Sequence, residues 1–252
     1  MKTVPKVAVI IPTADRYELL QRAIESILRQ TAPADEIIIV DNGISAVTVT
    51  SKDSRINYVR TAPRIGPGRS RNIGVQQSKS DLVGFLDDDD LWDAGYIEKS
   101  LIAFEASTAD VVVGQLMRLD HAGRPRPYKL FPVHSREQRR VYYCNPGFGG
   151  QNFITRKTFF TRLGGFDESM PASVDRDLAA RMLQAGGKLV VQPEAVAILC
   201  DHTGPRVRES QVNGNFLFIK KHWAMMTFTE RRRALRTFIK RYMRRSLQRI
   251  LG

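Results

Sequence analysis

The sequence predicts an α/β protein built around a mostly parallel sheet, and three observations lead to this prediction. Short segments that are apolar throughout recur along the first hundred residues, and segments with apolar residues at helical spacing separate them. Continuous apolar runs are typical of strands buried on both faces, as in parallel sheets. The chain has 252 residues, 42% of them hydrophobic. It is therefore long enough for one large domain, or for one domain with an appendage.

The first hundred residues alternate strands with helices. In the helix expected at Tyr17–Gln30, the stripe of apolar residues includes Leu20, Ile24 and Ile27. Pro12 is expected to close the first strand, and Asp41-Asn42-Gly43 is a turn signal after the second. The expected strands are Lys6–Ile11, Glu36–Val40, Ile56–Val59 and Leu82–Leu86, and the expected helices are Tyr17–Gln30 and Gly68–Ser78.

The second half has a less regular pattern. A strand is expected at Val111–Leu119, and the Pro- and Arg-rich stretch Asp120–Arg140 is expected to be an excursion or a flexible loop. The remaining elements are a strand at Gln151–Thr155, helices at Lys157–Leu163 and Val174–Ala185 that each stop at a glycine pair, a strand within Lys188–Leu199, and helices over the last forty residues.

Cysteine content and hydropathy exclude two classes of protein. Two cysteines, Cys144 and Cys200, cannot build the disulfide framework of a small secreted scaffold. The longest apolar run near the start, Val7–Ile11, is too short for a signal peptide or a membrane-spanning helix. We therefore expect a cytoplasmic protein, with peripheral attachment to the inner face of the cell membrane as a further possibility that depends on the charge.

The net charge of +13 comes mainly from the end of the chain. Residues 1–200 hold 26 basic and 23 acidic residues, whereas residues 201–252 hold 13 basic and 3 acidic residues. A basic protein can be a nucleic-acid-binding protein, but such proteins interleave basic and aromatic residues across a sheet or groove. Here the excess charge gathers in one terminal segment. We expect no nucleic-acid partner, although this class stays an alternative.

The terminal segment Glu230–Leu251 has the pattern of a cationic amphipathic helix. This pattern predicts binding to an anionic membrane surface through residues 228–252. The alternative is a helix that docks on the domain by its apolar face. The apolar positions are Leu235, Phe238, Ile239, Tyr242, Met243, Leu247, Ile250 and Leu251, and the basic ones include Arg232, Arg233, Arg236, Lys240, Arg244 and Arg245.

Four adjacent carboxylates, Asp87–Asp90, directly follow the strand Leu82–Leu86. Because like charges repel, their clustering indicates a compensating cation, and hard oxygen ligands suit Mg²⁺ or Mn²⁺. Ligands of open α/β sheets bind at the carboxyl ends of the strands. Asp41, at the end of the second strand, would face the same crevice and could accept a hydrogen bond from a base or ribose. Its alternative role is to cap a turn.

The glycine-rich segment Gly66–Gly74 does not match a dinucleotide-binding loop, since Arg71 stands where the third glycine belongs. Arg71 is expected to reach a ligand or to orient Asp87, or else to form a surface ion pair. A nucleotidyltransferase is the alternative enzyme class. It would normally carry a Gly-, Arg- or Lys-rich loop directly after the first strand, where this chain has Pro12-Thr13-Ala14-Asp15.

Several motifs in register resemble the family 2 glycosyltransferases, inverting enzymes of the GT-A fold. The resemblance covers about residues 5–205. It rests on Val9–Thr13 with Asp15-Arg16, Ile39–Gly43, Arg71–Gly74, Phe85–Asp90, the segment from Phe153–Arg156 through Gly164–Glu168, and Asp175–Arg181.

The resemblance implies an inverting, metal-dependent transfer from a nucleoside-diphosphate sugar to an acceptor hydroxyl of a sugar, a lipid-linked molecule or another glycoconjugate, in polysaccharide or glycolipid biosynthesis. Asp175 falls on the general base, and Asp87 and Asp89 fall on the "DxD" positions that bind Mn²⁺ or Mg²⁺. His202 is a possible further metal ligand. The implied nucleotide-sugar contacts are Pro12, Thr13, Asp15, Asp41, Arg71, Asp87 and Asp88.

Acceptor contacts are expected from Trp92, which could stack on a sugar or be a buried anchor, and from Asp177, a fallback base whose spacing better suits capping. Two residues depart from the family pattern. Asp15 stands where Asn is usual, and Val174 replaces the Glu that usually precedes the base. We expect a GT-A domain over residues 1–205, with a nucleotide-sugar half to about 110 and an acceptor half over about 111–205. A basic helical tail is expected over residues 206–252.

Overall fold

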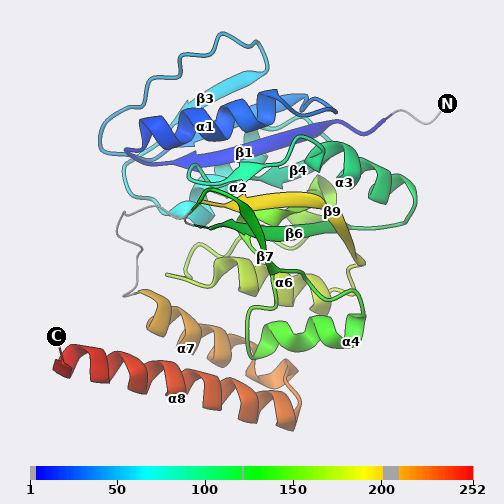
Figure 1. Ribbon diagram of the computed structural model, residues 1–252. Helices are drawn as coiled ribbons and strands as arrows, with labels where there is room; N and C mark the ends of the chain where they lie inside the picture. Colours follow the sequence, from blue (N-terminus) through cyan, green and yellow to red (C-terminus); the bar gives the residue numbers. More distant parts are fainter. Residues whose placement is uncertain (1–3, 121, 201–209, 252) are drawn as a thin grey trace.

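The first half of the chain alternates strands and helices as the sequence predicts (Figure 1). A computed structural model describes residues 4–120, 122–200 and 210–251. Parallel strands lie in the order β3-β2-β1-β4. Their bounds are β1 (Val7–Thr13), β2 (Glu36–Asp41), β3 (Ile56–Arg60) and β4 (Leu82–Phe85), and the helices between them are α1 (Tyr17–Leu28) and α2 (Pro67–Gln77).

Strand β1 continues through Pro12 instead of ending there. Its pairing with β4 stops at Ile10, so beyond that residue β1 has a neighbour on one side only, where Pro12 pairs with Val40 of β2. Proline is tolerated at such a local edge because no second ladder needs its missing N–H. The extension carries Thr13 to the carboxyl edge of the sheet.

The second half turns the sheet into a mixed one. Strand β8 runs antiparallel between β4 and β6, β9 is parallel to β6, and β5 closes the edge antiparallel to β9. Strands β1–β4, β6 and β9 therefore run in one direction, and β5 and β8 run against them. The elements are β5 (Leu91–Trp92), α3 (Tyr96–Glu105), β6 (Val111–Leu119), β8 (Phe153–Arg156), α5 (Lys157–Arg162), α6 (Val174–Gln184) and β9 (Leu189–Leu199).

The stretch Asp120–Arg140 was predicted as an excursion or a flexible loop, and this prediction is wrong for much of it. Strand β7 (Pro125–Lys129) pairs antiparallel with β6, and the short helices α4 (Ser135–Gln138) and η1 (Arg139–Tyr142) follow. The exposed residues of β7 lack an apolar pattern, because it is an added edge strand whose backbone pairing with β6, rather than side-chain burial, holds it.

Alternation along the strands divides the core between the two faces of the sheet. In β1, Val9 and Ile11 join the cluster that contains α1 and α3, whereas Ala8 and Ile10 join the cluster on the other face. The second cluster includes residues of α5, α6 and the C-terminal helices. The sheet therefore lies between two helical layers, with the thicker layer on the side of the C-terminus (Figure 1).

The C-terminal segment forms helices α7 (Ser210–His222), η3 (Trp223–Met225) and α8 (Phe228–Leu251), as predicted for the last forty residues. Phe218 of α7 and Ala234 of α8 belong to the same core cluster as β1 and β6. The division at residue 205 stays a prediction, but α7 packs as part of the core. Among the described residues, no helix is long and apolar enough to cross a membrane.

We expect Phe218→Ala to lower the free energy of unfolding by about 3–5 kcal/mol, because the ring is fully buried and lies under the guanidinium of Arg176, 3.8 Å away. Phe216→Ala, on the exposed side of the same helix, should cost less than about 1 kcal/mol. Urea denaturation of both variants measures the difference. Equal, small effects would mean that α7 does not contribute to the core.

Candidate active site

Seven of the predicted site residues, together with some of their neighbours, line one cavity of about 470 Å³ at the carboxyl edge of the parallel strands. Strand β1 and the turn after it, the turn after β2, the start of α2, the turn after β4 and the start of α6 each supply part of its wall. The lining residues are Pro12, Thr13, Ala14, Arg16, Asn42, Pro67, Arg71, Asp87, Asp88, Asp89, Val174 and Asp175.

Arg71 lies at the centre of this cavity wall, and its side chain is 5% exposed. Its guanidinium donates a hydrogen bond to Asp87, and its Nη1 lies 3.7 Å from an oxygen of Asp175. The ring of Phe166 covers the guanidinium at 5.2 Å. A Cβ at Gly150 would approach Arg71 to 2.6 Å, so only glycine leaves room for this side chain. Arg71 therefore links the two carboxylates that come from opposite halves of the fold.

Asp175 is placed at the first turn of α6, where its carboxylate faces Arg71. One of its oxygens is buried without a hydrogen-bond partner among the described residues. Burial raises the pKa of Asp175 above its ordinary value, the charge of Arg71 opposes that shift, and the nearby Asp87 adds to it. A carboxylate with a raised pKa and an unused acceptor oxygen is suited to taking up a proton.

The acidic cluster divides into two kinds of side chain. Asp88 faces inward, where it accepts hydrogen bonds from Thr13 Oγ1 at 2.8 Å and from Arg16 Nη1 at 3.1 Å. Burial is the main reason why the pKa of Asp88 rises to about 6, since Thr13 and Arg16 oppose the shift and the neighbouring Asp89 and Asp87 reinforce it. Asp88 therefore fixes the turn after β4 against β1.

Carboxylate oxygens of Asp87, Asp89 and Asp90 lie within 4.8 Å of one another. Such a group of hard oxygen donors fits a divalent cation. Asp90 was not among the predicted ligands. It is nearly buried and accepts a hydrogen bond from the N–H of Cys200 at 3.0 Å, which attaches the cluster to the end of β9. His202 lies outside the described residues.

Asp41 and Asp15 do not line the cavity. Asp41 is fully buried, and it accepts hydrogen bonds from Gly43 N, Val47 N and Tyr58 Oη and pairs with Arg60. Burial alone would raise the pKa of Asp41, but these hydrogen bonds and Arg60 outweigh it, and the pKa is lowered. In this arrangement Asp41 has the turn-capping role that the sequence left as an alternative.

Asp15 adopts a left-handed backbone conformation with φ 56°, and its carboxylate accepts hydrogen bonds from the N–H groups of Ile44 and Ser45. These bonds lower its pKa. Asp15 and Asp41 thus hold the turn after β2, and Asn42 is the residue of that turn that reaches the cavity.

Trp92 is not an exposed platform for a sugar. It is 3% exposed, its ring stacks on Tyr96 at 4.0 Å, and its indole N–H donates to the carbonyl of Gln151. Trp92 is the last residue of the short edge strand β5, and its side chain points into the core. It is the buried anchor that the sequence left as an alternative.

Asp177 also points away from the cavity, into the contact between α6 and α7. Its buried carboxylate lies 2.8 Å from Arg181 Nε, Lys221 Nζ and His222 Nε2. Burial opposes ionisation, but His222, Lys221 and Arg181 together hold the pKa of Asp177 well below its ordinary value. Asp177 therefore ties α6 to α7 and does not line the cavity.

Sequence reasoning did not assign roles to Arg16, Asn42, Asp90 or Gly150. Arg16 and Asn42 each directly follow a residue that the motifs marked, Asp15 and Asp41. A basic residue shortly after the first strand could have been predicted to pair with the four carboxylates that follow the fourth strand. The contacts of Asp90 with Cys200 and of Gly150 with Arg71 join segments far apart in the chain, so local patterns carry no trace of them.

Residues 8–164 match the family described as Glycosyl transferase family 2. The chain belongs to glycosyltransferase family 2. The match covers the strands and the acidic cluster that form the cavity, and it ends before α6, so the family match itself does not extend to Asp175.

Relatives of this glycosyltransferase carry names from polysaccharide biosynthesis. A putative colanic acid biosynthesis glycosyl transferase, WcaA of Escherichia coli K12, is 28% identical over 239 residues, which are 88% of this chain and 83% of that protein. The succinoglycan biosynthesis protein ExoO of Rhizobium meliloti is 24% identical over 208 residues, 76% of this chain and 60% of that protein.

Solved structures of S. aureus TarS share the fold. The structure in complex with UDP-GlcNAc superposes with a TM-score of 0.67 at 16% identity, covering 93% of this chain and 81% of that one. Another TarS structure gives a TM-score of 0.68 at 18% identity over 94% of this chain and 43% of that one. The predicted GT-A fold is confirmed.

We expect Asp177→Asn to lower the free energy of unfolding by about 3–5 kcal/mol at pH 7, because three cationic or hydrogen-bonding groups lose a buried partner. The pKa of Asp177 is lowered in the folded protein, so its contribution is complete above the unfolded pKa of about 4 and is lost as the pH falls below that. The difference between wild type and variant should therefore narrow below about pH 4 in urea denaturation series.

Asp53→Asn is the matched control, because the Asp53–Arg55 pair lies in a surface turn near β3. Its effect at pH 7 should be much smaller. A difference between wild type and Asp177→Asn that stays constant from pH 7 to pH 3 would contradict the assigned role of Asp177.

Proposed function

We propose that this glycosyltransferase transfers a sugar from a nucleoside-diphosphate sugar to an acceptor hydroxyl with inversion, and that Asp175 is the general base. The observation that carries the proposal is one cavity that holds a partly buried carboxylate from α6 and the carboxylate cluster that follows β4, with Arg71 between them. Inverting transfer needs one group to receive a proton on the acceptor side and another to hold the leaving diphosphate on the opposite side.

In the proposed step, the acceptor oxygen forms a bond to the anomeric carbon while the bond from that carbon to the diphosphate oxygen breaks. The electron pair of the broken bond leaves with the nucleoside diphosphate, and the hydroxyl proton passes to Asp175. Burial keeps the pKa of Asp175 raised, which favours proton uptake, and Arg71 keeps the carboxylate ionised beforehand. Asp177 is the weaker candidate base, because its carboxylate is occupied by α7.

The carboxylates of Asp87, Asp89 and Asp90 fit a divalent cation, Mn²⁺ or Mg²⁺, by their hard oxygen atoms and their spacing. Such a cation would supply charge neutralisation for the diphosphate as it leaves. Asp87 has a second function in this proposal, because it also orients Arg71.

The donor is proposed to lie against Pro12, Thr13, Arg71 and Asp88, with Asp15 and Asp41 shaping the turn that presents Asn42. The TarS structures named as complexes with UDP and with UDP-GlcNAc support a nucleotide-sugar donor. Val174, in place of the usual Glu, makes the wall beside the base apolar.

The names of the relatives support a role in the biosynthesis of a cell-envelope polysaccharide or a glycolipid. The acceptor is accordingly proposed to be a sugar, a lipid-linked molecule or another glycoconjugate. We place the reaction in the cytoplasm or at the inner face of the cell membrane.

Donor binding is tested by thermal shift with UDP, UDP-GlcNAc and other nucleotide sugars, each with and without Mn²⁺. A ligand at one hundred times its dissociation constant stabilises the folded state by about 2.7 kcal/mol, which raises the melting temperature of a chain this size by roughly 5–10 °C. The shift should require Mn²⁺ and should disappear in Asp89→Asn. Asp93→Asn, outside the cavity, is the control. Shifts of equal size without metal would remove the cation from the proposal.

The role of Asp175 is tested with a donor that passes the binding test. We expect Asp175→Asn to lower the rate of nucleoside-diphosphate release by about 10²–10⁴-fold, because the proton acceptor is removed. The Mn²⁺-dependent thermal shift should persist, because Asp175 is not among the proposed metal ligands. Retention of more than about a tenth of the wild-type rate would assign the base to another residue.

A further inference from the structure

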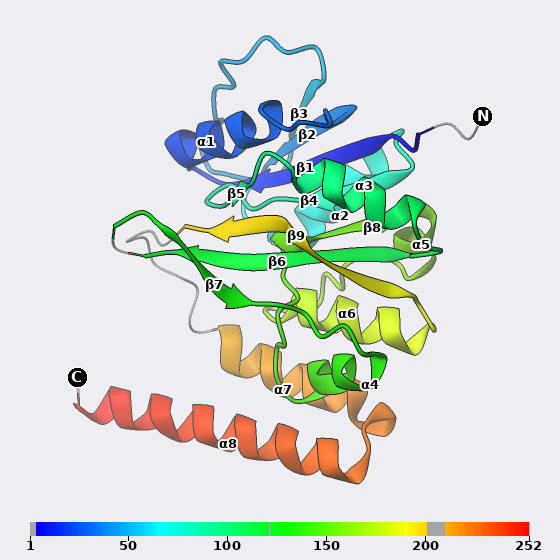
Figure 2. The ribbon, with the colours of Figure 1, turned by 45° about the vertical axis from the view of Figure 1, so that its right-hand side comes forward.

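The described side chains of helix α8 contact the domain along one side of the helix. Ala234 is 2% exposed in the core, Phe238 packs beside it, and Glu230 forms an ion pair with Arg139 at 2.8 Å. Figures 1 and 2 both show α7 between α6 and α8, so α8 is the outermost element at that end of the molecule. The docked alternative for this helix is therefore correct for one side, and the other sides face outward.

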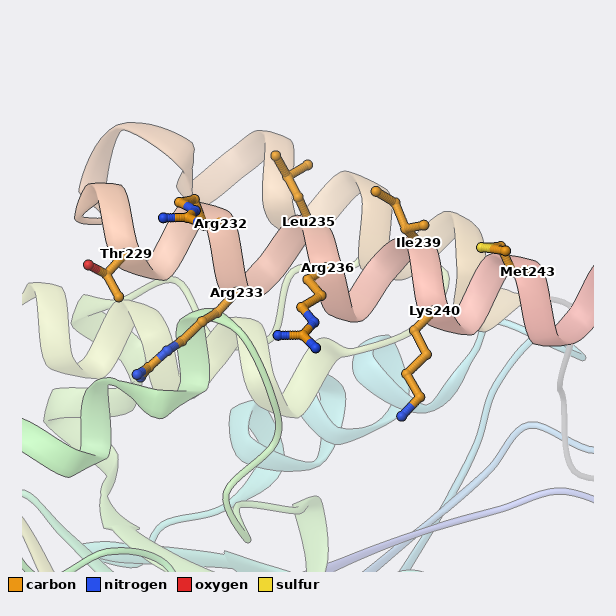
Figure 3. Close-up of a pocket in the computed structure, with 8 residues that line it drawn as sticks. All are labelled: Thr229, Arg232, Arg233, Leu235, Arg236, Ile239, Lys240 and Met243. Atoms are coloured by element: carbon orange, nitrogen blue, oxygen red, sulfur yellow. The ribbon is translucent and has the colours of Figure 1, made fainter.

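The outward side of α8 carries a row of apolar residues. Leu235, Ile239 and Met243 follow one another at intervals of four residues, and they are 42%, 53% and 57% exposed. They point to the same side of the helix (Figure 3). Phe228, at the start of α8, is 73% exposed and falls between Leu235 and Ile239 in helical angle. At 3.6 residues per turn these side chains span an arc of about 80°.

A basic row lies directly beside the apolar one. Arg232, Arg236 and Lys240 are exposed and also follow one another at intervals of four residues (Figure 3). The two rows border one open hollow of about 1050 Å³ along the helix. Residues 228–252 hold nine basic residues and one acidic residue. The outward face of α8 is therefore both apolar and cationic.

We infer that the outward face of α8 is a docking surface for an anionic bilayer. Leu235, Ile239, Met243 and Phe228 enter the boundary between headgroups and acyl chains, and Arg232, Arg236 and Lys240 contact the anionic headgroups. A helix that lies in the membrane plane presents this combination of an apolar stripe and a flanking basic stripe. Each basic residue near such a surface strengthens binding about five-fold.

Two other occupants fit the same face less well. A second copy of the chain would bring another helix with a net charge of +8 against the first, and no described acidic residue lines the hollow to compensate. A nucleic acid would pair with the basic row but would leave four large apolar side chains in water. The bilayer is the occupant that uses both rows.

The position of α8 would also bring a membrane-held acceptor close to the proposed site. This part of the inference rests on the proposed function. Helix α6, which carries Asp175, lies between the parallel strands and α7, so the proposed acceptor half is nearer to α8 than the nucleotide half is (Figures 1 and 2). The arrowhead of β1 and the end of α8 lie on the same side of the molecule in both views. A membrane-held acceptor would therefore meet the base side of the cavity.

The test is flotation of the full chain with two kinds of vesicle. One contains phosphatidylcholine alone, and the other also contains roughly 30% phosphatidylglycerol, to represent an anionic leaflet. We expect binding to the anionic vesicles that weakens on the order of 100-fold in Arg232→Gln/Arg236→Gln/Lys240→Gln. The triple variant Leu235→Gln/Ile239→Gln/Met243→Gln should lose binding to a similar degree, because the apolar row is no longer buried in the bilayer.

The matched control is Arg29→Gln/Arg124→Gln/Arg126→Gln, which removes three exposed charges away from α8 and should bind almost as well as wild type. Melting temperatures verify that every variant is folded.

Wild-type levels of vesicle binding in both α8 variants would overturn the inference, as would equal losses of vesicle binding in the control variant. Binding to RNA or DNA but not to vesicles, or a concentration-dependent dimer that the α8 variants abolish, would assign the face to that other occupant. No donor or acceptor is needed, so failure here is distinct from failure of the proposed transfer.

Discussion

The arrangement of the site depends on the ion pairs that the buried guanidinium of Arg71 forms with two carboxylates. The guanidinium stands between Asp87, which follows a strand of the parallel half, and Asp175, which begins a helix of the mixed half. Without a cation between them, these two carboxylates would repel each other. Gly150 leaves room for the side chain of Arg71, and the ring of Phe166 covers its guanidinium. The charge balance of the cavity is thus built into the packing of the two halves.

A second constraint acts from behind the site. Three consecutive residues of α6 point to two sides of the helix. Asp175 faces the cavity, whereas Arg176 and Asp177 bind α7. Arg176 donates to Asn215 and to two backbone carbonyls, and Asp177 binds Lys221 and His222. The orientation of the candidate base is therefore fixed by the C-terminal helices. The basic helix α8 packs against α7. Helix α7 in turn contacts α6 through Arg176 and Asp177.

Local patterns located most of the strands and helices and most of the residues that line the cavity. Continuous apolar runs located β1, β2, β4 and β6 within one or two residues, because burial on both faces of a sheet leaves a direct signature in composition. The residues that follow those strands then fell on one edge, as parallel topology requires. Strand β7 escaped detection because backbone pairing, which is independent of side-chain type, holds it to β6. The directions of Trp92, Asp41 and Asp177 escaped for a different reason. Tertiary partners such as Tyr96, Tyr58 and His222 determine which way each side chain points, and the local sequence does not identify those partners.

In the proposed reaction, one cavity holds a base on one side of the anomeric carbon and the diphosphate on the other, so the stereochemistry of the product tests the assignment of both groups. The measurement is time-resolved proton NMR of the first sugar product formed from an α-configured donor such as UDP-GlcNAc, in transfer or in slow hydrolysis. The arrangement of Asp175 opposite the acidic cluster predicts that the β-anomer is formed first, before mutarotation. Initial formation of the α-anomer would contradict it, because retention requires attack from the face that the leaving diphosphate occupies.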